Sequence, residues 1–174
     1  GDDSTNITGI NTVGANFYFG CGGIGSRLFQ QDSARNMIAG TNAGLAITLT
    51  TSPQPQANIL IGCCAGSRIR SQCYNVAIGV NAGKCTAAGS GGDTFVGTNS
   101  GLNAGKCGGT GNQNAFFGLG SGSCGYNPIG NTYIGYNAGK GHSDSTGGTG
   151  GTCNVAVGYH CLLYTSPSPR DLAV

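Results

Sequence analysis

Three adjacent residues, His142, Ser143 and Asp144, are the residue types of a serine-hydrolase triad. A triad works only when the three side chains converge, so that the histidine can take the proton of the serine hydroxyl. Adjacent residues in a loop rich in Gly and Ser point apart, and the chain contains no G-x-S-x-G nucleophile elbow. The sequence therefore predicts a solvated loop here, and a protein that is not an enzyme.

Two glycine-rich patterns resemble nucleotide-binding loops. GCGGIG, residues 20–25, fits G-x-G-x-x-G, but dinucleotide binding also needs a helix opening on the third Gly and an acid about 20 residues later. Asp32 comes too soon, and no helical pattern follows. GVNAGK at 79–84 and GYNAGK at 135–140 have three residues between their glycines, one fewer than a phosphate-binding P-loop needs. We therefore expect no cofactor.

Metal binding is the third chemistry to consider. SGGDTFVG, residues 90–97, resembles the calcium-binding nonapeptide of RTX β-rolls, which needs a recurring carboxylate because several oxygens ligate calcium. The chain has no Glu, and Asn fills the slot where Asp93 stands once. Cys63, Cys64 and Cys73 are a candidate zinc set, but they contain no C-x-x-C pair and have no His nearby. We expect neither metal.

A repeat dominates the chain. A stretch like NVAIGVNAGK, residues 75–84, occurs eight times at intervals of 17 to 23 residues. Each copy opens with Asn, or once with Asp, and has Gly in its fifth position. The opening residues are Asn16, Asn36, Asn58, Asn75, Asp93, Asn114, Asn131 and Asn154. The fifth residues are Gly20, Gly40, Gly62, Gly79, Gly97, Gly118, Gly135 and Gly158.

The side chains of one copy alternate as they do in a β-strand. Val76, Ile78 and Val80 point one way from an extended chain, whereas Ala77 and Gly79 point the other. No copy carries the i, i+3, i+4, i+7 apolar stripe of a helix, so we expect almost none. Because Gly weakens a strand, a Gly at a fixed place in every copy indicates a bend or the close approach of another backbone.

One short strand cannot bury its own apolar face, but stacked copies bury a continuous column and pair each backbone with the next. The sequence therefore predicts an all-β fold, a β-solenoid of about eight rungs with Gly-rich loops, as a single domain over residues 1–160. The opening Asn residues would form an amide ladder along the stack. A second, incomplete ladder would contain Asn42, Asn81, Asn99 and Asn137.

The last segment departs from the repeat. CLLYTSPSPRD, residues 161–171, begins inside the eighth copy and resembles the translation of a transposase adapter used to prepare DNA libraries. We therefore expect residues 161–174 to be an artefact at the end of a metagenomic fragment, and exclude them from the fold.

Cysteines and charge bear on the compartment and the partners. Cross-links in the variable loops would staple neighbouring rungs, and the pairings we favour are Cys85 with Cys107 and Cys124 with Cys153. Such disulfides imply an extracellular or virion surface. The net charge of +2 rests on eight scattered Lys and Arg residues, so we expect no nucleic-acid partner. No apolar run approaches the roughly 18 residues of a membrane span.

The copies NVAIGVNAGK, NTYIGYNAGK and NVAVGYH, at residues 75–84, 131–140 and 154–160, resemble the shaft repeats of phage tail fibres. More loosely, they are similar to the head repeats of trimeric autotransporter adhesins. The resemblance implies a solenoid that is commonly a homotrimer and carries an attachment function, without catalysis in the repeat. The chain departs from these families in its cysteines and in loops longer than the adhesin rung allows.

We expect a structural, non-catalytic fibre segment that serves as a rigid spacer or attachment surface. Its expected partners are further copies of itself, as a homotrimer or an end-to-end filament, and a cell-surface glycan or receptor. Association would cover apolar side chains that face outward by alternation, some of them among Phe17, Phe19, Phe116, Phe117 and Tyr133.

The alternative is an ice-binding solenoid, in which small polar groups on a flat face order water. Thr41 and Thr98 suggest it, but the same slot also holds Cys63, Val80 and Tyr136, so no uniform row exists. A carbohydrate-active enzyme would need clustered charged residues, whereas the Asp residues before the last segment are dispersed.

Overall fold

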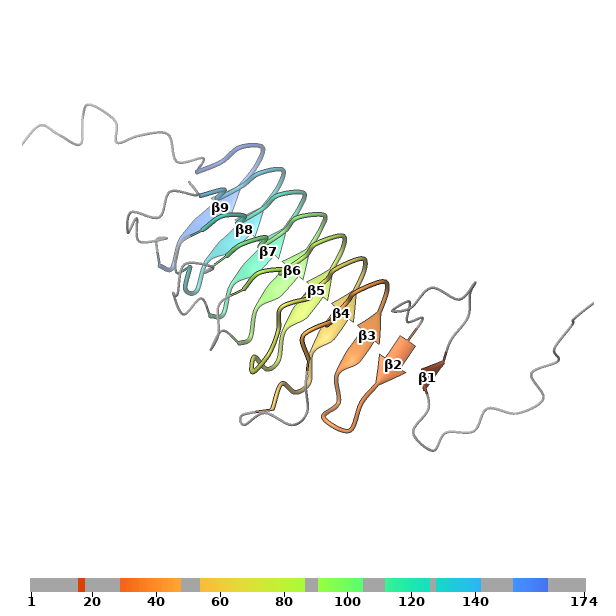
Figure 1. The fold of residues 1–174 in the computed structure, drawn as a ribbon. Helices are drawn as coiled ribbons and strands as arrows, with labels where there is room; N and C mark the ends of the chain where they lie inside the picture. The colour runs from red at the N-terminus through yellow and green to blue at the C-terminus, as the bar shows by residue number, and fades with distance from the viewer. Residues whose placement is uncertain are drawn as a thin grey trace, which may run out of the picture.

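The computed structural model describes residues 16–17, 29–47, 54–86, 91–104, 112–125, 128–141 and 152–162. Within these ranges the chain forms short strands and no helix, and the strands lie side by side in sequence order in one sheet (Figure 1). The strands are β1 (Asn16–Phe17), β2 (Phe29–Gln31), β3 (Met37–Ala39), β4 (Ile59–Ile61), β5 (Val76–Ile78), β6 (Thr94–Val96), β7 (Ala115–Phe117), β8 (Thr132–Ile134) and β9 (Val155–Val157).

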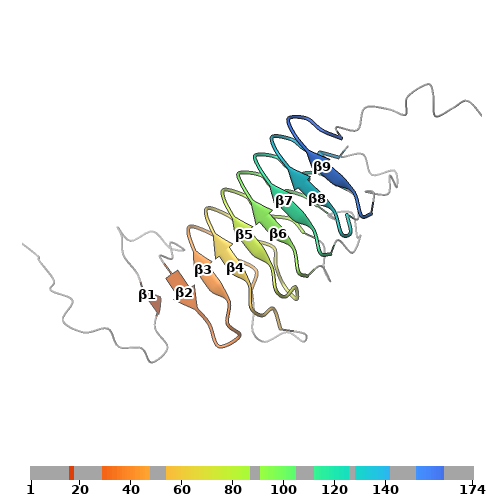
Figure 2. The same cartoon turned by 180° about the vertical axis from the view of Figure 1, so that it is seen from behind.

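Seven strands, β3 to β9, are parallel and in register. Each pairs with the next through equivalent positions, so that Ile38 lies beside Leu60 and Leu60 beside Ala77. From the end of each strand the chain turns back and returns to start the next one, which is visible from both sides (Figure 2). This arrangement is a β-solenoid and confirms the predicted all-β fold.

The first copy of the repeat does not join the parallel stack. Asn16 pairs with Gln30 because β1 is antiparallel to β2, and β2 is in turn antiparallel to β3. Residues 29–31 thereby occupy the edge of β3 on which a parallel first rung would stack. The expected eight rungs are therefore not confirmed, since seven copies form parallel strands. Gly20 lies outside the described residues.

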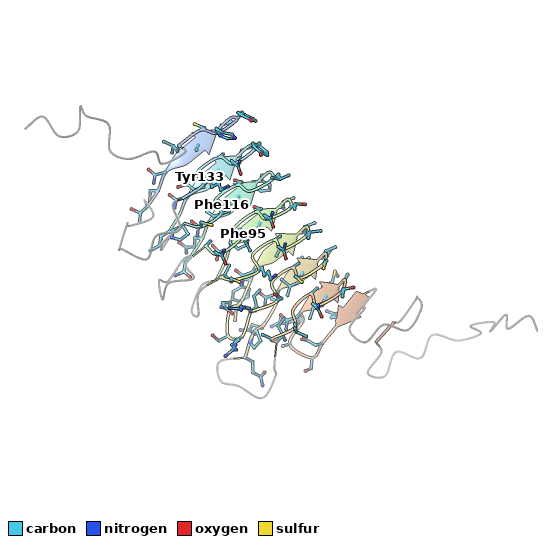
Figure 3. All side chains as sticks on the ribbon, turned by 45° about the horizontal axis from the view of Figure 1, so that its top comes forward. Phe95, Phe116 and Tyr133 are labelled. Carbon is cyan, nitrogen blue, oxygen red and sulfur yellow. The ribbon has the colours of Figure 1, made fainter. Side chains whose placement is uncertain are left out.

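The middle residue of each parallel strand points into the solenoid. These residues are Ile38, Leu60, Ala77, Phe95, Phe116, Tyr133 and Ala156, and none is more than 3% exposed. Figure 3 shows the three aromatic members in line along the stack. The ring centroids of Phe95 and Phe116 are 5.5 Å apart. Those of Phe116 and Tyr133 are 4.8 Å apart, and the planes of these two rings are nearly parallel. Burial and ring contacts together stabilise this part of the core.

The alternation of side chains along each strand decides which of the aromatic residues face outward, a question that the sequence left open. Phe116 and Tyr133 face inward, so they do not belong to the apolar surface, whereas Phe117 is 38% exposed. The side chains of Phe17 and Phe19 lie outside the described part of the structure. The turn supplies small interior residues, among them Ser100 and Ser121, which are fully buried and donate their hydroxyls to the backbone carbonyls of Phe116 and Tyr133, each at 3.0 Å.

The Gly that follows each parallel strand has a backbone conformation that favours Gly, and all of these glycines except the last, Gly158, also lie against the backbone of the next rung. Gly79 has a φ of 131°, which L-residues rarely adopt. A Cβ atom built on it would lie 2.7 Å from the carbonyl oxygen of Gly97 in the next rung. The equivalent glycines of the other parallel rungs have φ between 112° and 130°.

The final described residues continue the turn after β9. Gly139 donates its backbone N–H to the carbonyl of Cys161 at 2.8 Å, and Cys161 is partly buried against the core. Leu162 has a φ of 52° in a slot where the six preceding parallel copies have Gly. Residues 163–174 lie outside the described ranges, so the domain boundary after residue 160 stays a prediction.

A methyl group added at Gly79 should destabilise the fold through both strain and contact with Gly97. We expect Gly79→Ala to lower the free energy of unfolding, measured by urea denaturation, by more than the roughly 1–3 kcal/mol of a strained backbone alone. Gly92→Ala is the control, because Gly92 has a φ of 72° but its added Cβ would meet its nearest neighbour only at 3.8 Å. Equal losses in the two variants would contradict the close approach of the rungs.

Candidate functional site

The polar residue that opens each copy lies inside the solenoid. Six of these side chains are at most 4% exposed, and they belong to Asn36, Asn58, Asn75, Asp93, Asn114 and Asn131. Asn154, in the last copy, is half-buried. Buried polar groups cost free energy unless they are hydrogen-bonded, so the partners of these side chains decide whether they stabilise the stack.

The side chains form a continuous column, which we call the amide column. Asn58 Nδ2 donates to Asn36 Oδ1 at 2.8 Å, and Asn75 Nδ2 donates to Asn58 Oδ1 at 3.0 Å. The steps from Asn114 onward repeat this bond, at 2.9 to 3.4 Å. The same oxygens also accept the backbone N–H of the next copy, at 2.8 to 3.1 Å. Every step of the column except the one from Asn75 to Asp93 therefore joins two neighbouring rungs by two hydrogen bonds.

Loop carbonyls accept the second N–H of several of these amides. Asn36 Nδ2 donates to the carbonyl of Pro55 at 2.9 Å, and Asn114 Nδ2 donates to that of Pro128 at 2.8 Å. At the first rung, Asn36 Nδ2 also donates to the Asp32 carboxylate at 2.8 Å. The amide column therefore anchors loops of different length to one line through the molecule.

Asp93 is the exception in the column. Its Oδ1 accepts both the side-chain and the backbone N–H of Asn114, each at 2.9 Å. Toward the preceding copy it donates only a backbone N–H in the bonds seen here, to Asn75 Oδ1 at 3.0 Å, since an ionised carboxylate has no hydrogen to donate. Burial raises the pKa of Asp93 to about 6, although the bonds from Asn114 act in the opposite direction. The column thus contains one group that titrates.

The second Asn column is incomplete, as predicted, because some copies have another residue in place of this Asn. Asn81 Nδ2 donates to Asn99 Oδ1 at 3.1 Å, and all four Asn residues have φ between 52° and 58°. In three copies Cys64, Gly120 and His160 occupy this slot, with φ of 59°, 69° and 54°. Asn and Gly tolerate this backbone region better than most residues, so the slot is also set by the turn.

Three columns of side chains point away from the interior of the solenoid, and we call the surface that they form the outward face. They are the first strand residues (Met37, Ile59, Val76, Thr94, Ala115, Thr132, Val155), the third strand residues (Ala39, Ile61, Ile78, Val96, Phe117, Ile134, Val157) and the corner residues (Thr41, Cys63, Val80, Thr98, Leu119, Tyr136, Tyr159). None of these residues carries a charge, and all except Ala39 are exposed or half-buried.

Aromatic rings gather at the C-terminal end of the corner column. The ring centroids of Tyr136 and Tyr159 are 5.1 Å apart, and His160 stacks on Tyr159 at 4.2 Å. Tyr159 is 77% exposed and Tyr136 is 41% exposed. This end of the face therefore presents stacked rings to solvent, a feature that the periodicity of the sequence did not single out.

The structure does not confirm the disulfides that the sequence predicted. Cys124 and Cys153 carry free thiols, so the structure does not confirm their pairing. Cys85 also carries a free thiol, so its pairing with Cys107, which lies outside the described residues, is not confirmed either. The Cys73 thiol contacts the carbonyls of Gln54 and Ser71, at 3.5 and 3.7 Å, and does not join Cys63 and Cys64. In the part of the chain that the structure describes, no three His, Cys, Asp or Glu side chains are grouped to hold a metal ion.

The remaining motifs give no site that can be described. GCGGIG at 20–25 and the triad residue types at 142–144 lie outside the described ranges. Lys84 is half-buried and Lys140 is exposed, both in the turn after the strand. Among the described residues, none forms a helix that could cross a lipid bilayer.

Comparisons of the chain with protein-family models, with curated proteins and with solved structures find no match. The fold and its surfaces are therefore the basis for inferring function.

Replacing Asp93 with Asn should remove the titrating group and supply the missing amide. The folded-state pKa of about 6 lies above the usual value of 3.8, so the wild-type protein is more stable at low pH and loses this stability as the pH rises through about 6. We expect the free energy of unfolding of Asp93→Asn to exceed that of the wild type by up to about 3 kcal/mol near neutral pH. Urea denaturation at a series of pH values measures this difference.

The matched control is Asn131→Asp, which places a carboxyl at another buried position of the column. It should lose stability near neutral pH and regain it on acidification, opposite in direction to Asp93→Asn. Parallel stability curves for the wild type and Asp93→Asn between about pH 4 and about pH 7 would contradict this account of the column.

Proposed function

We propose that the chain is a structural, non-catalytic fibre segment of an extracellular or virion surface, where it serves as a rigid spacer or attachment surface. The observation that carries the proposal is the stack itself, in which seven parallel rungs and one amide column run through the described molecule without a break.

Rigidity follows from the number of independent ties between neighbouring rungs. Equivalent strands are hydrogen-bonded along their length, and the bonding continues into the turn, where Cys64 donates its backbone N–H to the carbonyl of Thr41 at 2.8 Å. The amide column adds a further tie on the other side of the strand. With rungs about 4.8 Å apart, seven rungs span roughly 29 Å. Bending would strain all three sets of bonds together, which suits a spacer.

Self-association is the use that best fits the outward face. The two strand columns of this face extend over all seven rungs, about 29 Å, and the corner residues continue the uncharged surface into the turn. An exposed apolar patch of several hundred Å² marks an interaction site on most monomers. Because no charged side chain lies in these columns, a second copy of the same face is a suitable partner, and a closed homotrimer would cover it on each chain.

The stacked rings of Tyr136, Tyr159 and His160 favour an attachment function. Exposed aromatic rings give a flat, apolar platform with polar edges, and such residues are frequent where proteins bind other molecules. A cell-surface glycan or receptor is the expected partner at this end of the fibre. The ice-binding alternative is less well supported, because two of the outward columns interrupt their Thr residues with larger apolar ones and the third column contains no Thr. Absence of thermal hysteresis in dilute solution would remove it.

A charge placed in the middle of the outward face should prevent association without unfolding the chain. We expect the wild-type protein to form a multimer by light scattering, and Ile78→Lys to shift the mass toward that of one chain. Ile78 is 36% exposed, so its replacement removes little from the core. Thermal unfolding should show that the variant remains folded.

Leu45→Lys is the matched control, because Leu45 is 65% exposed and its slot already holds Lys84 and Lys140 in other copies. Its mass should equal that of the wild type. A wild-type protein that stays strictly monomeric at high concentration, and forms no filaments, would overturn the proposed self-association.

A further inference from the structure

Two adjacent thiols lie together at the corner of the second parallel rung. The Sγ atoms of Cys63 and Cys64 are 3.7 Å apart, directly after Gly62 and β4. Cys63 is exposed and Cys64 is half-exposed, so ions in solution can reach both. The remaining described cysteines have no second thiol within hydrogen-bonding range in the bonds seen here.

The backbone at this corner disfavours a disulfide between the two residues. Adjacent Cα atoms across a trans peptide are about 3.8 Å apart, whereas unstrained disulfides span about 4.4 to 6.8 Å between Cα atoms. A disulfide here would be strained and easily reduced. We therefore expect Cys63 and Cys64 to remain as two thiols and not to form a disulfide with each other.

The observed separation suits a metal ion instead. In a tetrahedral site with metal–sulfur bonds of about 2.3 Å, two sulfur ligands are about 3.8 Å apart, close to the 3.7 Å between these Sγ atoms. We propose that Cys63 and Cys64 form a two-thiolate site for a thiophilic cation of the zinc and cadmium type. The two thiols would bind without rearrangement of the rung, and water would complete the coordination.

Binding needs no oxidant and no further protein group. Two metal–sulfur bonds form, the two thiols release their protons to solvent, and the hydrated ion loses all of its water ligands except the two that complete the tetrahedral site. The hydrogen bond shared with Cys64 is the main cause that raises the pKa of Cys63, and the ammonium of Lys84 acts against it. The site lies within one chain, so it does not depend on the proposed self-association.

Cadmium protection of the two thiols tests the proposal on the full, reduced chain. One equivalent of Cd²⁺ should slow alkylation of Cys63 and Cys64, measured by peptide mass spectrometry, while exposed Cys153 is alkylated at its usual rate. Because two linked ligands bind far more tightly than one, Cys63→Ser and Cys64→Ser should each weaken Cd²⁺ binding by roughly 100-fold or more.

The control variant is Cys153→Ser, which should bind Cd²⁺ as the wild type does. The proposal is overturned if Cys63 and Cys64 are alkylated at the same rate with and without Cd²⁺. It is also overturned if the two residues are recovered as a disulfide that persists in a mild thiol buffer.

Discussion

The buried amide column is the constraint on which the rest of this structure depends. An Asn side chain in a solenoid interior is costly unless both its oxygen and its N–H groups are paired. Here Asn58 Oδ1 accepts the backbone and side-chain N–H of Asn75, and its own amide donates to Asn36 and to the carbonyl of Gln72. These bonds exist only when equivalent positions lie directly over one another. A shift of one residue would turn every amide to the other face, so the column fixes the register of all seven parallel strands.

The other repeated residues follow from this register. Once the rungs are aligned, the backbone of Gly79 lies so close to Gly97 that no side chain fits between them. The same alignment places the rings of Phe95, Phe116 and Tyr133 in contact along the interior. Segments that lie outside the strand and turn have no such neighbour in every copy, and their length varies. The repeat therefore tolerates insertion in its loops and not in its strands.

The fold was predictable because its strongest determinants are local and periodic. Asn at the head of each copy and Gly four residues later are both poor strand residues, and their regular return indicates a shared structural need. Periodicity could not tell that Phe116 faces inward and Phe117 outward, since both are apolar. It also could not show that β2 would pair antiparallel with β3 and displace the Asn16 copy, because β2 contains no copy of the motif. The pKa of Asp93 and the proximity of the Cys63 and Cys64 thiols depend on burial and on turn geometry, which a sequence pattern does not contain.

A stack held by one buried column gives a rod with regular hydrogen bonds between rungs and one uncharged face, and these properties support the proposed fibre role. The most direct test of the column is hydrogen exchange of its side-chain amides, followed by NMR. The Nδ2 hydrogens of Asn58, Asn75 and Asn114 should exchange only when the whole solenoid unfolds, because each is bonded in the interior. Exchange of these hydrogens as fast as in the urea-unfolded chain would contradict the account, since the rungs would then not be joined through their Asn residues.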